Sequence, residues 1–257
     1  MTADVPIVKT NGAGNDFVLV DGREVALDDP AAFARRVCDR TTGIGADGVL
    51  LVESSATGDA WMRIINADGS EAEMCGNGIR CVARYLDERE QREAFTIDTL
   101  AGPIGARIVA RSPYRVEVEM AEPRIGATVR SEGFTGIPVD LGNPHLVVAV
   151  DDVDAVDLAT VGPRIERDPQ FPSGTNAHFV QRDGDGWRVR HWERGAGATQ
   201  ACGTGAVAVG AVLIANGQAG SPVSLRVPGG VLEVAWTPGQ RATLTGDAVR
   251  EFTQVVR

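Results

Sequence analysis

Residues 191–205 read HWERGAGATQACGTG and end in the motif Cys-Gly-Thr-Gly. A related stretch occurs earlier, because residues 66–78 read NADGSEAEMCGNG and also end in Cys-Gly-polar-Gly. Cys75 and Cys202 therefore lie about half a chain apart, and Gly14-Asn15 and Gly142-Asn143 recur at nearly the same separation. Two matches at one separation predict an internal duplication in which each copy supplies one cysteine.

Each Cys-Gly-polar-Gly motif is followed by residues with helical character. Ile79, Val82 and Leu86 have the spacing of one helical face, and residues 206–214 are apolar on every face. We therefore expect helices over residues 76–87 and 203–216, with a cysteine at the amino end of each. Unpaired N–H groups and the helix dipole at this position favour a thiolate, so the sequence predicts thiol pKa values lowered toward neutrality.

A thiolate and a thiol on either side of a small anionic substrate suit inversion at a carbon next to a carboxylate. The thiolate would remove the α-proton from one face and the thiol would deliver a proton to the other, while backbone N–H groups stabilise the charge that develops. The sequence contains no pyridoxal or nucleotide fingerprint, so no cofactor is expected. Gly43, Gly45 and Gly48 fit G-x-G-x-x-G, but they precede a predicted strand and not a helix, which argues against a phosphate-binding loop.

The composition argues against a nucleic-acid-binding or membrane protein. The 257 residues are 43% apolar, enough for one large domain or two of ordinary size, of which the duplication favours two, and 35 acidic against 25 basic residues give a net charge of −10. The first ten residues lack a signal-peptide pattern, and the longest apolar run, residues 206–215, is too short to span a bilayer. We therefore expect a cytoplasmic protein with free thiols and no metal, because Cys75 and Cys81 have no further ligand at metal-site spacing.

The remaining pattern alternates short strands with few helices, which indicates an α/β chain. Further helices are expected over residues 30–40 and 153–164, and strands at 17–20, 49–52, 61–65, 145–150, 177–181 and 187–192. Frequent Pro and Gly place the boundary between the halves in residues 121–136.

Together these motifs resemble the diaminopimelate epimerase family. The similarity runs from Lys9 to beyond Gly246 and is carried by many ordered motifs. They are residues 12–17 (GAGNDF), 43–48 (GIGADG), 66–70 (NADGS), 75–81 (CGNGIRC), 142–145 (GNPH), 193–197 (ERGAG) and 201–205 (ACGTG).

The resemblance implies a cofactor-independent enzyme that interconverts LL- and meso-2,6-diaminopimelate for lysine and peptidoglycan synthesis. It implies two pseudo-symmetric α/β (α+β) domains, each with strands around a central helix and with the active site in the cleft between them. The expected domains are residues 1–121, to which the final strand 250–257 returns, and residues 122–249. The resemblance further implies a homodimer, with Phe252 at an aromatic position of the dimer contact.

The same resemblance assigns individual roles. Cys202 would accept the proton from the LL substrate and Cys75 would donate the proton that replaces it, with the roles exchanged in the reverse reaction. His145 and Glu193 would tune the thiols, and Arg194 would bind the distal carboxylate through both oxygens. Further substrate contacts would come from Asn15, Asn66, Gly76, Asn77, Asn143, Asn176, Glu193, Gly203 and Thr204. Ala198 departs from the family pattern, which has Glu at this position.

Two other interpretations of the residues remain open. The first is a racemase of proline, hydroxyproline or histidine that uses the same cysteine pair. Asn77 at the third motif position, where proline racemases have His, and Arg194 for a distal carboxylate argue against it. The second is a thiol redox or metal-binding protein that uses Cys75, Cys81 and Cys202, but C-x-x-C spacing is absent.

Overall fold

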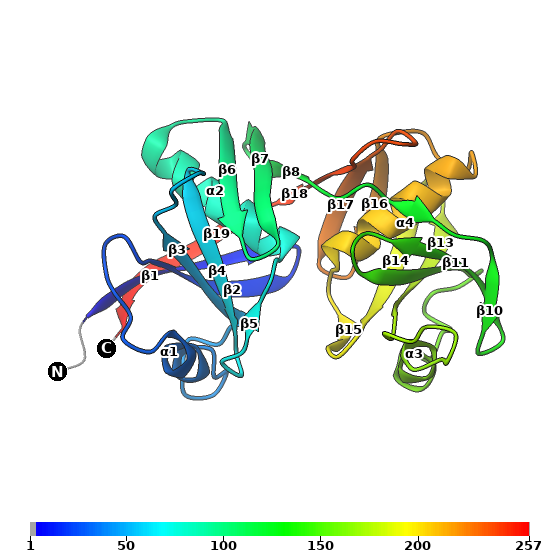
Figure 1. Ribbon diagram of the computed structural model, residues 1–257, viewed down its shortest axis with the longest axis horizontal. Helices are drawn as coiled ribbons and strands as arrows, with labels where there is room; N and C mark the ends of the chain where they lie inside the picture. Colours follow the sequence, from blue (N-terminus) through cyan, green and yellow to red (C-terminus); the bar gives the residue numbers. More distant parts are fainter. Residues whose placement is uncertain (1–3, 257) are drawn as a thin grey trace. The chain divides into compact units, whose positions relative to one another are not determined.

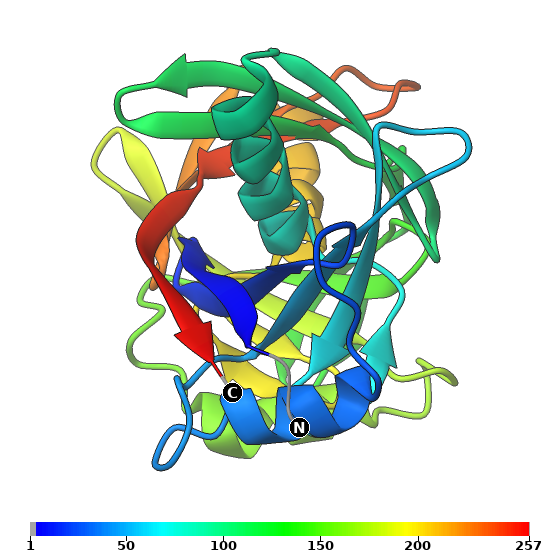
Figure 2. The same cartoon turned by 90° about the vertical axis from the view of Figure 1, so that its left-hand side faces the viewer.

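The computed structural model describes residues 4–256, and contacts within the chain divide it into two compact units. The first unit is Met1–Val118 with Gly246–Arg257, and the second is Glu119–Thr245. Residues 1–3 and 257, which the expected halves include, lie outside the described residues. Within the first unit the two ends of the chain meet, because β19 (Val249–Val256) pairs antiparallel with β1 (Val5–Gly12), as Figure 2 shows.

The first unit is built around the helix α2 (Gly76–Glu90), whose first three turns are almost entirely buried. Strands β1, β2, β3, β4, β6 and β7 all contact this helix (Figures 1 and 2). The other elements are β2 (Asn15–Asp21), α1 (Pro30–Val37), β3 (Gly48–Glu53), β4 (Ala60–Asn66), β5 (Glu71–Ala72), β6 (Ala94–Thr99), β7 (Gly102–Arg111) and β8 (Tyr114–Glu119).

The second unit is built around α4 (Gly203–Ala215), which is apolar on all sides and is contacted by strands β11, β12, β13, β16 and β17 (Figure 1). No helix among residues 4–256 has both the length and the apolar character that a bilayer span requires. The other elements are β9 (Arg124–Ile125), β10 (Val129–Ser131), β11 (Phe134–Asp140), β12 (Pro144–Ala149), α3 (Leu158–Glu166), β13 (Asn176–Asp183), β14 (Gly186–Glu193), β15 (Gly197–Thr199), β16 (Val223–Val227) and β17 (Gly230–Ala235). The strand β18 (Thr243–Asp247) begins in the second unit and ends in the first.

Strand register reveals the duplication in detail. In the first unit β2 pairs parallel with β3, β3 antiparallel with β4, and β4 antiparallel with β5, which leads into Cys75 and α2. In the second unit β12, β13, β14 and β15 repeat these three pairings in the same order and lead into Cys202 and α4. The predicted fold class, α/β with two similar halves around central helices, is confirmed.

Several predicted helix boundaries were wrong, including the end of α2, which continues to Glu90 and not to residue 87. Helix α1 ends at Val37 and not at residue 40, because the carboxylate of Asp39 accepts hydrogen bonds from the N–H groups of Thr41 and Thr42 and turns the chain away. Helix α3 begins at Leu158 and not at residue 153. Asp157 caps its first turn by accepting from the Thr160 N–H.

The region expected to hold the boundary between the halves contains strands that the sequence pattern did not indicate. Within residues 121–136 lie β9, β10 and the start of β11. Both β9 and β10 pair with β11, and they contain only two and three residues. Strands this short have no visible alternation, so their pairing depends on β11 and not on local sequence.

Candidate active site

Cys75 is the N-cap residue of α2 and has an extended backbone, with φ −144° and ψ 114°. It is half-buried, and its thiol donates to the Asn15 side-chain oxygen at an Sγ–Oδ1 distance of 3.7 Å. The Asn77 amide nitrogen reaches the same oxygen at 3.4 Å. Three residues that the sequence assigned to the site, Asn15, Cys75 and Asn77, therefore lie together in the first unit.

Asn15 is held in place by Asp47, the acidic residue of the Gly43–Gly48 loop. The Asp47 carboxylate accepts from the Asn15 amide nitrogen at 2.6 Å and from the Asp16 N–H at 2.9 Å. Arg40 donates to the other oxygen of the same carboxylate at 2.7 Å. Asn15 itself follows a tight hairpin whose two central residues, Ala13 and Gly14, have φ of 53° and 81°. The loop thus orients the amide whose oxygen faces the Cys75 thiol.

Arg80 fixes Asn77 from behind. Its side chain is fully buried, and its Nη2 donates to the Asn77 amide oxygen at 3.0 Å while its Nε donates to the Asp247 carbonyl at 2.9 Å. Burial lowers the pKa of Arg80 from its usual value, but guanidinium stays charged in proteins. With its oxygen taken by Arg80, Asn77 presents its amide nitrogen toward Asn15.

The last glycine of each motif is required for packing of the helix against the sheet. A Cβ on Gly78 would lie 2.8 Å from Cδ2 of Leu50, and one on Gly205 would lie 2.3 Å from Cε1 of His178. A side chain at either position would push the helix away from the strand beneath it.

Cys202 is the N-cap residue of α4 and is 4% exposed. Its sulfur accepts a hydrogen bond from the Gly205 N–H at 3.3 Å and lies 3.7 Å from the Thr204 hydroxyl. The thiol also donates to the carboxylate of Glu193, at the end of β14. The second unit therefore brings together the predicted residues Glu193, Cys202 and Thr204.

The expected lowering of the Cys202 pKa was wrong. Burial raises the pKa of Cys202 well above 9.0, the negative charge of Glu193 raises it further, and the hydrogen bonds with the Thr204 hydroxyl and the Gly205 N–H only partly oppose them. Burial likewise raises the pKa of Glu193 above its usual 4.5. The helix amino terminus does favour the thiolate, but one N–H donor is outweighed by loss of solvent and a neighbouring carboxylate. In this state Cys202 is a neutral thiol.

Replacing Glu193 by Gln is expected to lower the pKa of Cys202, because the carboxylate charge is removed and a side chain of equal size remains. Titration of the Cys202 ¹³Cβ resonance, assigned by its loss in Cys202→Ala, measures this pKa directly. Glu132→Gln is the matched control, since Glu132 is an exposed carboxylate paired at 3.7 Å with Arg164. An equal or higher Cys202 pKa in Glu193→Gln would show that the carboxylate does not oppose thiolate formation.

Asn143 and His145 form a second polar group of the same unit. His145 is 1% exposed, and its Nε2 lies 2.9 Å from the Asn143 side-chain oxygen. Its Nδ1 lies 2.8 Å from Nε2 of His178, so both ring nitrogens are engaged. Burial, together with the positive charge of Arg194, lowers the pKa of His145 to about 3. His145 is therefore a neutral imidazole at physiological pH.

The side chains of the other predicted substrate residues differ in how many hydrogen bonds they already make within the chain. The Asn176 amide is occupied at both ends, since its nitrogen donates to the Pro144 carbonyl at 2.8 Å and its oxygen accepts from the Arg194 N–H at 2.9 Å. Arg194 has an exposed side chain, with Nη1 donating to the Ser173 carbonyl. Asn66 lies at the end of β4 and donates to the Ser70 hydroxyl at 2.9 Å.

Sequence reasoning missed several residues that position these groups. Asp47 and Arg80 stand inside motifs that were recognised, so the motifs themselves contained the signal. The sequence signal for His178 and His191 was weaker. With His145 they are the only three histidines of the sequence, and the structure buries all three.

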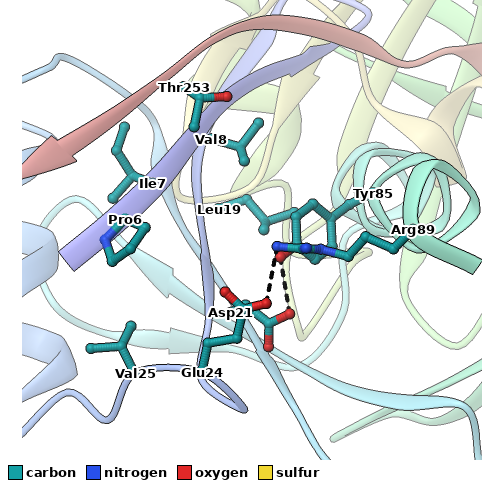
Figure 3. A pocket seen from close by; sticks show the side chains of 10 residues that line it. All are labelled: Pro6, Ile7, Val8, Leu19, Asp21, Glu24, Val25, Tyr85, Arg89 and Thr253. Atoms are coloured by element: carbon teal, nitrogen blue, oxygen red, sulfur yellow. Dashed lines mark hydrogen bonds and ion pairs between the residues drawn. The ribbon is translucent and has the colours of Figure 1, made fainter.

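A small hollow in the first unit lies apart from this group of residues. It has a volume of about 60 Å³, and its lining is mainly aliphatic (Figure 3). The polar groups there are already paired, since Tyr85 donates to Asp21 at 2.9 Å and Arg89 pairs with Glu24 at 3.2 Å. This volume holds about two water molecules, so the hollow cannot accommodate an amino-acid substrate.

Comparison with known proteins places the chain among amino-acid epimerases. The family model described as diaminopimelate epimerase matches residues 7–126 and 137–251. The diaminopimelate epimerase of Pelotomaculum thermopropionicum is 42% identical over 95% of this chain and 96% of its own. That of Parabacteroides distasonis is 38% identical, with 100% of both chains covered.

Solved structures share the fold at much lower sequence identity. A phenazine biosynthesis protein of the PhzF family from Bacillus anthracis superposes with a TM-score of 0.76 at 18% identity, covering 100% of both chains. A hydroxyproline epimerase from Agrobacterium vitis superposes with a TM-score of 0.70 at 19% identity, covering 99% of this chain and 93% of its own. The fold is thus shared widely, whereas the full-length sequence matches are specific, and by them this chain belongs to the diaminopimelate epimerase family.

Proposed function

We propose that this protein is an isomerase that interconverts LL- and meso-2,6-diaminopimelate by proton transfer at one α-carbon, within lysine and peptidoglycan precursor synthesis. Family membership supports the substrate, because relatives about 40% identical over nearly the whole chain are named diaminopimelate epimerases. One structural observation supports the mechanism most strongly. Both halves of a duplicated fold end the same four-strand arrangement in a cysteine that caps the central helix.

In the proposed reaction Cys202 is the base and Cys75 is the acid for the LL substrate. The Cys202 sulfur takes the α-proton as the C–H bond breaks, and Cys75 delivers its S–H proton to the opposite face of the same carbon. The reverse reaction exchanges these roles. Because Cys202 is a neutral thiol before reaction, it must first lose its proton, and Glu193 is the group that already accepts a hydrogen bond from it. Both proton transfers then involve only side chains of this chain.

The amino ends of α2 and α4 supply the donors for the substrate's carboxylate. Gly76 with Asn77 and Gly203 with Thr204 are first-turn residues, whose N–H groups have no partner within the helix. Such groups bind carboxylates and stabilise the enolate-like charge that develops when the α-proton leaves. They therefore lower the barrier without a covalent cofactor.

The remaining polar residues of the site are proposed to recognise the rest of the substrate. Arg194, whose exposed guanidinium is planar, would bind the distal carboxylate through both oxygens. Its charge distinguishes a dicarboxylic substrate from proline or hydroxyproline. Contacts to the amino and carboxylate groups are assigned to Asn15, Asn66, Asn143, Asn176 and Glu193, with His145 acting on the thiols.

We also propose a cytoplasmic homodimer. Support comes from β19, which exposes three large apolar side chains, Val249, Phe252 and Val255, along one strand. The three lie three residues apart along the strand, and exposed apolar side chains of this kind are available for contact with a second copy. Sedimentation velocity of the purified protein reports the oligomeric state directly.

The function is tested by offering the reduced enzyme LL-diaminopimelate, meso-diaminopimelate, proline, hydroxyproline and histidine separately and following stereochemistry by chiral chromatography. We expect an LL and meso mixture from either diaminopimelate isomer and no inversion of the other amino acids. Inversion of proline, hydroxyproline or histidine without turnover of diaminopimelate would replace this proposal with the racemase alternative.

A further inference from the structure

A row of polar side chains crosses the buried face of the second unit beneath α4. His178 on β13 pairs in register with His191 on β14, which pairs in register with Thr199 on β15. His178 is 0% exposed and His191 is 1% exposed. The His178 ring packs against the amino end of α4, since a Cβ on Gly205 would lie 2.3 Å from Cε1 of His178. These residues are therefore part of the interior and not of the surface.

The duplicated half shows that the fold does not require this polar row. At the corresponding register positions of the first unit, Leu50 on β3 pairs with Ile64 on β4, which pairs with Ala72 on β5. Leu50 also lies under Gly78 of α2, as His178 lies under Gly205 of α4. An aliphatic row fills the same place, so burying imidazoles in the second unit has a cost that packing alone does not offset. What distinguishes the imidazoles from the aliphatic row is the hydrogen bonds that they make.

The hydrogen bonds form a single chain that starts at Asn143. The Asn143 oxygen lies 2.9 Å from Nε2 of His145, and Nδ1 of His145 lies 2.8 Å from Nε2 of His178. Nδ1 of His178 then lies 2.8 Å from Nδ1 of His191. Among residues 4–256, Nε2 of His191 has no hydrogen-bond partner, so the chain of hydrogen bonds ends there.

The orientation of the Asn143 amide and the positions of the protons along this chain fix one another. When the amide oxygen faces His145 it only accepts, so His145 carries its proton on Nε2 and its Nδ1 is an acceptor. His178 must therefore donate from Nε2 and accept at Nδ1, and His191 must donate from Nδ1. Each ring is neutral in this arrangement, which agrees with burial lowering the pKa of all three. The ordering leaves the Asn143 amide nitrogen as the group that can donate outward.

We propose that His178 and His191 are positioning residues, which lock His145 in its Nε2–H tautomer and thereby hold Asn143 with its amide nitrogen toward the substrate. The proposal rests on the proposed function, because it takes Asn143 as a substrate ligand. The alternative of a metal site does not fit, since His178 uses both nitrogens within the chain of hydrogen bonds. Among the residues that the structure describes, no group of three metal-ligating side chains is present.

The test uses long-range ¹H–¹⁵N correlation spectra of protein labelled with ¹⁵N at histidine. The ring signals of His145, His178 and His191 are each assigned by their loss when that histidine is substituted. In the wild type at pH 7.5 we expect protons on Nε2 of His145, Nε2 of His178 and Nδ1 of His191. His178→Leu, which copies Leu50 of the other half, should release His145 into a mixture of tautomers. It should raise KM for diaminopimelate about tenfold, the value of one hydrogen bond, with little change in kcat.

His178→Gln is the rescue variant, because its amide can donate to His145 and accept from His191 in the same sense. It should restore both the His145 tautomer and KM, whereas a merely structural role would make it no better than His178→Leu. A proton on Nδ1 of His145 in the wild type, or an unchanged tautomer and KM in His178→Leu, would overturn the proposal. Failure of the wild type to epimerise diaminopimelate would overturn the proposed function while the NMR result still decides the tautomers.

Discussion

Replacing Cys75 or Cys202 by Ala is expected to reduce kcat for diaminopimelate by about 10³-fold or more. Each thiol handles one proton at the reacting carbon, and a positioned acid or base contributes about 10² to 10⁴ in rate. Both losses should be similar in size, since inversion needs a group on each face of the carbon. The folds should persist, because each cysteine is a small side chain at a helix N-cap whose sulfur makes few contacts. The measurement is steady-state epimerisation in both directions with each variant.

Cys38→Ala is the matched control for the thiol substitutions. Cys38 caps the carboxyl end of α1, is 3% exposed, and has a pKa raised by burial to about 11. Its thiol is therefore an inert part of the core, and its loss should leave kcat near the wild-type value. Retained turnover in Cys75→Ala or Cys202→Ala would contradict the two-thiol mechanism, and an inactive Cys38→Ala would show that thiol loss acts through stability.

Lowering the pH from 7 to 5 is expected to reduce the free energy of unfolding of the second unit by about 6 kcal/mol, or about 2 kcal/mol for each buried histidine. Burial lowers the pKa of His145 and His191 from 6.5 to about 3, and that of His178 well below 6.5. The unfolded chain therefore takes up protons that the folded chain does not. This contribution to stability is fully present above pH 6.5 and is lost as the pH falls toward 3.

The double variant His178→Leu/His191→Ile, which copies Leu50 and Ile64 of the other half, should lose only about 2 kcal/mol over the same pH interval. Urea unfolding at pH 7 and pH 5, followed for both proteins by the fluorescence of their tryptophans, measures the difference. Paired carboxylates such as Asp21 and Asp87 have pKa values lowered below 3.8, so they become protonated only below this pH interval. Their contribution to the free energy of unfolding is the same in both proteins. The same pH dependence in both proteins would show that the histidines are not kept neutral by the fold.

Much of the fold was predictable because its strongest features are local in sequence. The helix that follows Cys75 has clear apolar spacing, the helix that follows Cys202 is apolar throughout, and the Cys-Gly-polar-Gly motif marks where each helix begins. The duplication was visible for the same reason. The short strands β9 and β10 were not, because two or three residues have no periodicity of their own and are strands only by pairing with β11.

The candidate site was predictable where it consists of motif residues and not where it depends on register. Asn15 and Cys75 are far apart in sequence yet meet, and their motifs had already been recognised. The chain of histidines needs the alignment of β12, β13 and β14, which no local pattern reveals. The pKa of Cys202 was mispredicted because a helix terminus can be identified from sequence, whereas burial beside Glu193 cannot.

The central claim is that two separate thiols act on opposite faces of one carbon. The most direct measurement is epimerisation of LL-diaminopimelate in deuterium oxide, stopped at low conversion, with deuterium at the α-carbon quantified by mass spectrometry in substrate and product. Two bases predict a meso product that contains one solvent deuterium at the inverted centre and a recovered LL substrate that contains none. Equal deuterium in recovered substrate and product, as one base serving both faces would give, or a product without deuterium, would contradict the account.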